Sequence, residues 1–162
     1  RNYKDFSYDV LAKKVHSLRI YGYEYNGYYA HIDSLQSYYE NSLGLLKNEN
    51  LQSLFYSAIG PIYTKVKDST PTKYCKDANV KNSLIASGCI IEGTVENRII
   101  FRGVRIGKNA VVKNSIIFQH GIIGENAKLD SIITDTYAQV TNDRVLLGYS
   151  NCPFFIKKHS IV

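Results

Sequence analysis

The second half of the chain repeats one pattern of apolar and polar positions four times. Each copy begins with Val or Leu, continues through a charged residue and one or two further polar or charged residues, and ends on two adjacent apolar residues. The copies occupy residues 80–85, 95–100, 112–117 and 129–133. Aligned on Ser83, Arg98, Ser115 and Ser131, they are spaced 15, 17 and 16 residues apart. Self-similarity at so short a period predicts stacked coils rather than an ordinary globular domain.

Shorter apolar steps fill the gaps between these copies. Residues 106–112 and 123–129 both follow the pattern Ile-Gly-x-x-Ala-x-Val/Leu. Apolar residues thus recur about every six positions, which suits three short strands in each coil of a parallel β-helix. One apolar residue from each copy is then expected to point inward and to stack on the next. These residues are Ile85, Ile100, Ile117 and Ile133.

The first sixty residues follow different patterns. Apolar residues at helical spacing predict a helix over residues 9–16. Alternation in residues 20–25 predicts a strand, Asn26-Gly27 is a typical hairpin turn, and residues 28–32 are expected to return as the partner strand. A lone hairpin with two helices cannot bury so many aromatic side chains, so this region is interpreted as the end of a larger α/β domain.

A second helix is expected after the hairpin, with Asp33 or Ser34 as its N-cap. Its broad apolar face comprises Leu35, Tyr38, Tyr39, Leu43 and Leu46. The polar stretch that holds Pro61 and Pro71 is predicted to be a linker or an extended crossing segment, because proline disfavours helix and donates no hydrogen bond. We therefore predict a mainly β protein with an α/β remnant at 1–60, a linker at 61–76 and a β-helix domain at 77–162.

Composition narrows the class of partner. The net charge is +6 and the pI is about 9.1, which favours anionic partners. Lysine and arginine are scattered along the chain without a basic run or an aromatic RNA-binding motif, so we expect no nucleic acid and regard phosphorylated metabolites as the better match. A solvated basic surface without a ligand is the alternative.

The start of the chain, its hydrophobic segments and its cysteines indicate the cellular compartment. The chain begins at Arg1 and has no Met, so we expect it to be part of a longer protein. No segment has the pattern of a signal peptide or the length of a membrane span, so no membrane association is expected. Its three cysteines have no CxxC spacing and are expected to be idle or buried thiols in a reducing compartment, the cytoplasm.

Several segments, taken in order, resemble one enzyme family. Residues 27–41, Gly-Tyr-Tyr-Ala-His-Ile-Asp-Ser-Leu-Gln-Ser-Tyr-Tyr-Glu-Asn, resemble Gly-Tyr-Trp-Arg-Asp-Val-Gly-Thr-x-x-Ser-Tyr of bacterial glucose-1-phosphate adenylyltransferases (ADP-glucose pyrophosphorylases). Residues 4–10 resemble the Asp-Phe-x-x-Asp-Ile/Val segment that precedes it, and 61–64 and 71–73 resemble the linker. The repeats are similar to the left-handed β-helix that ends these enzymes.

The resemblance implies a role in glycogen biosynthesis. The family makes ADP-glucose and pyrophosphate from ATP and glucose 1-phosphate with Mg²⁺. Here His31 stands where the family has its metal-binding Asp, and Ala30 where it has Arg. An imidazole is a poor ligand for Mg²⁺, which prefers oxygen. A packed or surface histidine is the simpler interpretation of His31. The pattern looks like the regulatory D-type subunit that accompanies a catalytic partner in Gram-positive bacteria.

The resemblance does not extend to the catalytic half of these enzymes, which carries their Gly-rich nucleotide-binding loop. Neither GxGxxG nor GxxxxGK occurs in the sequence. As the resemblance implies, the chain is expected to supply assembly and allosteric coupling in a homo- or hetero-oligomer, without catalytic residues, metal or cofactor of its own. Whether the parent protein retains catalysis stays open.

Candidate residues for an anionic effector, such as a sugar phosphate, lie in the β-helix region. Lys157 and Lys158 follow an apolar triplet and stand where related plant enzymes carry a lysine for an anionic activator. A lysine ammonium binds phosphate as a point charge. Arg102, Arg105 and Arg144 are further candidates for a basic cleft. The alternative is that these side chains are only solvated.

Two other classes of protein use the same repeats. A hexapeptide-repeat acyltransferase needs a histidine as general base, and His120 is the candidate on the coils, although it is interpreted more simply as a coil corner. A β-helix carbonic anhydrase needs three histidine ligands, and the coils offer one. A purely structural oligomerisation module remains a further alternative.

Overall fold

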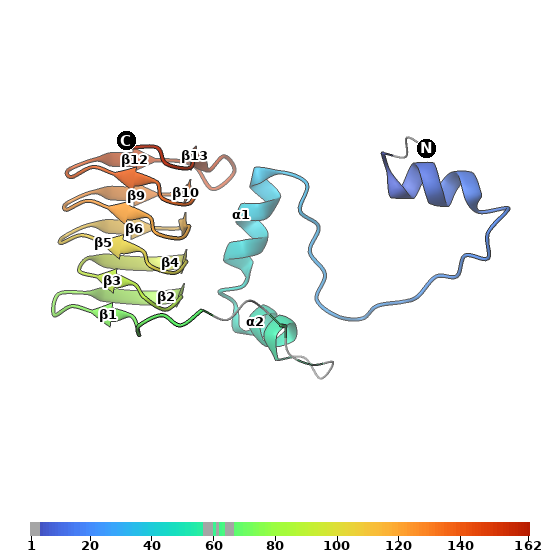
Figure 1. Cartoon of the computed structure of the whole chain (residues 1–162), viewed down its shortest axis with the longest axis horizontal. Helices are drawn as coiled ribbons and strands as arrows, with labels where there is room; N and C mark the ends of the chain where they lie inside the picture. The colour runs from blue at the N-terminus through green and yellow to red at the C-terminus, as the bar shows by residue number, and fades with distance from the viewer. Residues whose placement is uncertain (1–3, 57–59, 61, 64–66) are drawn as a thin grey trace.

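The computed structural model of the protein describes residues 4–56, 60, 62–63 and 67–162. A parallel β-helix forms the C-terminal part, and helices α1 (Leu35–Gly44) and α2 (Asn48–Phe55) lie beside it (Figure 1). The strands stack coil on coil, with the C-terminus at the opposite end of the stack from the first strand. The predicted mainly β fold with stacked parallel coils is confirmed.

One face of the β-helix is a five-stranded parallel sheet, which we call face A. Its strands are β1 (Lys73–Tyr74), β3 (Ile90–Ile91), β5 (Arg105–Ile106), β8 (Ile122–Ile123) and β11 (Gln139–Val140), in that order. Every neighbouring pair is parallel, so each strand belongs to the next coil.

Two longer strands each bend around a corner, so that their two halves belong to the other two faces of the β-helix. They are β2 (Asn79–Ile85) and β4 (Thr94–Ile100), which bend at Asn82 and Asn97. The first half of β4 pairs with β6 (Val111–Lys113), followed by β9 (Lys128–Asp130) and β12 (Val145–Leu147). The second half pairs with β7 (Ile116–Ile117), followed by β10 (Ile132–Thr134) and β13 (Phe154–Ile156), and we call this side face C.

The corner between these two faces is built from asparagine. Asn82, Asn97 and Asn114 have φ of 42°, 56° and 46°, a left-handed conformation that asparagine tolerates better than most residues. Their side chains form a ladder in which Asn82 Nδ2 donates to Asn97 Oδ1 (2.8 Å) and Asn97 Nδ2 donates to Asn114 Oδ1 (3.3 Å). Asn114 Nδ2 donates in turn to Asp130 Oδ1 (2.9 Å). The repeated Asn of the sequence is therefore the corner residue.

The interior of the coils is filled by aliphatic side chains from all three faces. Ile85, Ile100 and Ile117 belong to this core, as predicted, and the last two are almost completely buried. Other members are Ile91, Val95, Val104, Ile106, Val112, Ile123, Leu129, Ile132 and Val140. Because water is excluded from the interior of the middle coils in this way, burial of apolar surface stabilises the stack.

The prediction for Ile133 is wrong. Ile117 pairs with Thr134, whereas Ile133 pairs with Ile116 and packs outside the coil against α1. The reason is that Ser131, with φ of 55°, takes the corner position. The true spacing of the corner residues Asn82, Asn97, Asn114 and Ser131 is 15, 17 and 17 residues, so the fourth copy is shifted by one position.

The N-terminal region contains helices and, in the residues described, no strand before β1. The predicted hairpin at 20–32 is wrong: this segment is extended and unpaired. A two-stranded hairpin is marginal in water without a sheet or helix to cover it, which accounts for the difference. The predicted first helix is present as the π-type helix η1 (Phe6–Ala12), which begins three residues early.

The second helix forms as predicted. Ser34 is the N-cap of α1, and its hydroxyl accepts a hydrogen bond from the backbone N–H of Ser37 in a capping box. Strand β1 lies inside the predicted linker 61–76, where Gly88 N–H already donates to the Thr70 carbonyl. Pro61 and residues 64–66 of that linker lie outside the described residues.

Candidate functional site

His31 lies on the extended segment before α1 and is exposed. Its Nδ1 is 3.8 Å from Asp33 Oδ2, and both side chains are largely in solvent. Hydrogen bonds from Ser37 and Ser34, with a smaller contribution from His31, lower the pKa of the Asp33 carboxyl. Among the residues that the structure describes, no group of three or more His, Cys, Asp and Glu side chains is placed to hold a metal ion.

The two C-terminal lysines follow β13 directly. Lys157 comes at the end of the strand, and Lys158 lies in the turn that leads to His159, which has φ of 58°. Both lysines are exposed. Because Lys158 belongs to a turn, the two side chains do not alternate along one extended strand. Lys157 projects from the end of a strand, whereas Lys158 projects from the turn that follows it.

His120 is a coil corner, as the sequence predicts, with φ of 57°. Its ring stacks on Tyr137 at 5.0 Å between centroids and 12° between planes, and Tyr137 stacks on His159 at 5.1 Å and 4°. The three residues form a ladder of rings along one edge of face A. Among the described residues its imidazole has no side-chain hydrogen bond that would orient it as a general base.

Helix α1 covers face C. Tyr39 is 3 % exposed and packs with Ile116 and Ile133, and partly buried side chains surround this cluster. These are Tyr38, Leu43, Ile99, Phe101 and Phe118, and the rings of Phe101 and Phe118 stack at 4.7 Å. Gln36 Nε2 also donates to the Ser150 carbonyl (2.9 Å) in the loop between β12 and β13. The helix is thus fixed to the outside of the coils at several levels.

Arg98 follows the corner residue Asn97 in β4 and is buried. It pairs with Ser83 in the neighbouring coil and is 0 % exposed. Its Nε donates to the Glu96 carbonyl (2.9 Å), whereas Nη1 and Nη2 have no partner among the described residues. Burial lowers the pKa of the guanidinium to about 8, and the charges of Asp130 and Glu96 oppose that shift. The buried charge is therefore only partly compensated.

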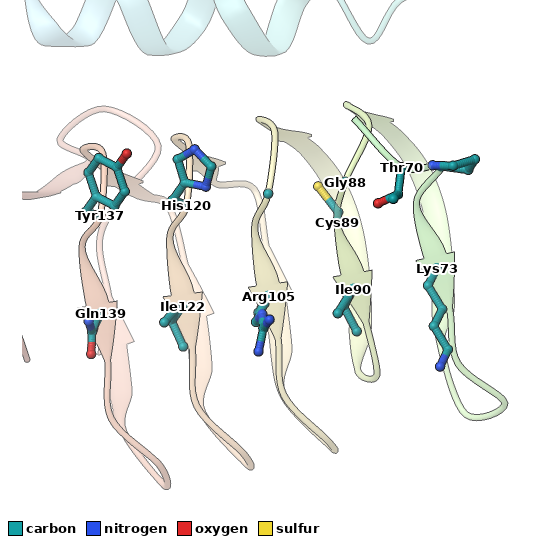
Figure 2. A pocket seen from close by; sticks show the side chains of 12 residues that line it. Thr70, Lys73, Gly88, Cys89, Ile90, Arg105, His120, Ile122, Tyr137 and Gln139 are labelled. Carbon is teal, nitrogen blue, oxygen red and sulfur yellow. The ribbon is translucent and has the colours of Figure 1, made fainter. Parts of the chain in front are cut away.

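The three candidate arginines are not all brought together. Arg105 lies on face A, in a row of paired positions that runs Lys73, Ile90, Arg105, Ile122 and Gln139 (Figure 2). Arg102 lies across the adjacent corner from this row. Arg144 precedes β12 on another face, apart from Arg102 and Arg105.

Sequence reasoning missed two features of this surface. The burial of Arg98 had a signal, since a large cation stands where the other three copies of the repeat, as aligned in the sequence, have serine. The ring ladder had none, because Tyr137 and His159 become neighbours of His120 only through the coil register.

All three cysteines are free thiols, and Cys152 is exposed. Cys89 is buried, and burial raises the pKa of its thiol.

In the part of the chain that the structure describes, no helix has both the length and the apolar character needed to cross a membrane.

The chain is similar to a hexapeptide-repeat family and to proteins of glycogen biosynthesis. The family described as GlmU-like, C-terminal hexapeptide matches residues 68–151. The "Glycogen biosynthesis protein GlgD" of Bacillus subtilis is 46% identical over 150 residues, which cover 93% of this chain and 43% of that protein. The protein of the same name from Geobacillus stearothermophilus is 48% identical over 56% of this chain and 33% of its own length.

Enzymes are found among the relatives as well. The glucose-1-phosphate adenylyltransferase of Mycoplasma mobile is 37% identical over 114 residues, 69% of this chain and 29% of that protein. The chain therefore spans less than half the length of these curated relatives.

Proposed function

The chain belongs to the GlmU-like C-terminal hexapeptide family, and from that premise we propose that it is the assembly and allosteric portion of a regulatory subunit in glycogen biosynthesis. Its parent would resemble glucose-1-phosphate adenylyltransferases. The observation that carries the proposal is the similarity to GlgD over 93% of the chain, which includes the α1 region as well as the repeats. Repeats alone occur in many classes of protein and would not distinguish them.

The surface of the N-terminal region supports a role in assembly. Tyr21, Tyr23 and Tyr29 are 85%, 89% and 76% exposed. Clusters of exposed aromatic side chains are typical of surfaces that another domain or subunit covers. The expected partner is the catalytic subunit of the same family, in a homo- or hetero-oligomer in the cytoplasm.

The surroundings of His31 and His120 favour a regulatory role over a catalytic one. His31 replaces the family's metal-binding Asp, and it lies exposed beside a single carboxylate. We therefore propose that this portion binds no Mg²⁺ and no ATP. The acyltransferase alternative has no specific support, because the His120 ring is stacked in the ladder rather than held against a carboxylate.

An effector site at the C-terminus is part of the proposal. Lys157 and Lys158 are exposed and free of ion pairs among the described residues, as a site for an anion requires. A sugar phosphate is the expected class of effector, held by charge-assisted hydrogen bonds. Lys157, at the strand end, is the residue expected to matter more.

Binding to a catalytic subunit tests the proposal. The chain is mixed with a purified glucose-1-phosphate adenylyltransferase from the same source, and the mass of the complex is measured by light scattering during size exclusion. A complex with a defined ratio of the two proteins is expected. A chain that stays monomeric at high concentration and does not bind the enzyme would contradict the assignment.

A further inference from the structure

Basic side chains gather at one corner of the β-helix. Two hollows, of about 750 Å³ and 770 Å³, lie on either side of the corner formed by Gly88 and Gly103. They share four lining residues, Thr70, Gly88, Gly103 and His120, so they meet across that corner. We call the combined depression the corner saddle. Figure 2 shows the hollow on the face A side, with His120 and Tyr137 along its upper edge.

Each side of the saddle carries two basic residues. Lys73 and Arg105 line the hollow on face A, and Lys67 and Arg102 line the other. Asp68 is the one carboxylate among the lining residues. Net positive charge focused in a concave surface attracts anions.

The cations of the saddle have no partners within the part of the chain that the structure describes. Among the described residues, ion pairs to carboxylates involve Lys13, Lys113 and His31, and none of the four basic residues of the saddle. None of these four side chains donates a hydrogen bond there either. Their donors are therefore free to meet a ligand, in contrast to Lys113, which lies 3.9 Å from Glu96.

The saddle exists because the ladder of rings ends at His120. In the two coils below, the corner residues are Gly103 and Gly88, with φ of 69° and 80°. A Cβ on Gly103 would lie 2.5 Å from His120 Nδ1, so only glycine lets the imidazole settle over this corner. The result is a floor of bare backbone at Gly88 and Gly103, bounded on one side by the imidazole of His120, whose Nδ1 lies next to Gly103.

These groups match the chemistry of a phosphate. A guanidinium binds phosphate oxygens in a bidentate manner, and an ammonium binds them as a point charge. Lys73 and Arg105 lie two coils apart on face A, which corresponds to about 9–10 Å at the usual strand separation. Two cations at that distance suit a molecule longer than inorganic phosphate.

We propose that the corner saddle binds a phosphorylated metabolite, with Arg105 on a phosphate group, Lys73 on a second polar or anionic group of the same molecule, and His120 as a further hydrogen-bond donor. The ligand is either a nucleotide or a sugar phosphate, since both present the same anionic group. This site is separate from Lys157 and Lys158, and it depends on this chain alone, so its outcome does not depend on the proposed partner or pathway.

Calorimetry on the whole chain tests the site directly. The probes are ADP, glucose 1-phosphate and inorganic phosphate, with adenosine and glucose as uncharged counterparts. Binding of ADP or glucose 1-phosphate but not of its uncharged counterpart is expected, and the probe that binds more tightly identifies the class. Binding to neither phosphorylated probe at millimolar concentration would overturn the proposal.

Matched variants separate the site from general charge. Arg105→Gln is expected to weaken binding about tenfold or more, because one charge-assisted contact is lost. Lys128→Gln removes one charge from an exposed position on β9, away from the saddle, and is expected to change affinity less than twofold. Equal effects of the two substitutions, with both proteins folded by circular dichroism, would show that the binding is non-specific and would overturn the assignment.

Discussion

The phenol of Tyr39 on α1 donates a hydrogen bond to the backbone carbonyl of Asn114, 2.5 Å away at a corner of the β-helix. The ring is 3 % exposed, so this bond is made in a largely apolar contact between helix and coils. Tyr39 therefore joins the N-terminal region to the repeat domain, together with the Gln36 hydrogen bond to Ser150 and the packing of Tyr38 and Leu43.

Tyr39→Phe is expected to destabilise the docking of α1 by about 1 kcal/mol, the usual net value of one hydrogen bond. The packing area is unchanged, so the loss reports the bond to Asn114 alone. Urea denaturation followed by circular dichroism measures it. An unchanged midpoint would contradict the role given to the phenol, and Tyr21→Phe, at an exposed position, is the matched control.

The same residue predicts a pH dependence. Burial raises the pKa of Tyr39 in the folded protein above its ordinary value of 10.0. The unfolded chain therefore loses this proton first, and stability that is present below pH 10 declines as the pH rises above 10. Comparing the stability of wild type and Tyr39→Phe at pH 9 and pH 11 isolates this contribution. The variant is expected to lose less stability; an equal loss would show that the phenol is not involved.

Ile117→Asp is expected to destabilise the β-helix by roughly 3 kcal/mol or more, because it places an unpaired charge in the core. Ile117 is 0 % exposed, whereas Ile161 is 70% exposed at the end of the stack. Ile161→Asp is therefore the control and is expected to have a small effect. Similar losses for both substitutions in thermal unfolding would contradict the inward orientation of Ile117.

Arg98→Met is expected to leave stability within about 1 kcal/mol of wild type or to raise it. Two of its guanidinium nitrogens are buried without a partner in the described part of the chain, and replacing such a charge with an apolar side chain of similar length is often neutral or favourable. Denaturant midpoints give the answer. A loss well above 2 kcal/mol would show that the charge of Arg98 is fully compensated in the folded chain.

Lys157→Ala is expected to weaken binding of a phosphorylated effector by the full-length subunit, by about 1.5–3 kcal/mol for one charge-assisted contact. Lys158→Ala is the matched control and is expected to matter less, since Lys158 lies in the following turn. Calorimetry at two salt concentrations measures both. Unchanged affinity and salt dependence after Lys157→Ala would show that Lys157 and Lys158 are only solvated and form no effector site.

Much of the fold followed from the period of the repeats, and its failures have physical causes. The stacking of Ile100 and Ile117 follows from the hexapeptide period and is confirmed. Ile133 was misplaced because Ser131 can be aligned either with the serine or with the corner asparagine, and sequence similarity favoured the serine. The structure shows that the left-handed corner decides the register.

The N-terminal region was harder to predict because its patterns depend on partners. The alternation in residues 20–25 is typical of a strand, but a strand requires a neighbour, and none is present in the described chain. The cap of α1 depends only on local hydrogen bonds, and Ser34 was therefore predictable. The corner saddle depends on residues from several coils, and spacing alone did not reveal it.

The most direct test of the regulatory assignment is the rate of ADP-glucose synthesis by a catalytic glucose-1-phosphate adenylyltransferase, measured alone and with the full-length parent of this chain. The chain by itself is expected to form no ADP-glucose from ATP, glucose 1-phosphate and Mg²⁺. Together, the parent is expected to change the maximal rate or the effector response of the enzyme several-fold. Turnover by the chain alone that is lost on His31→Ala, or an enzyme that is indifferent to the parent at saturating concentration, would contradict the account.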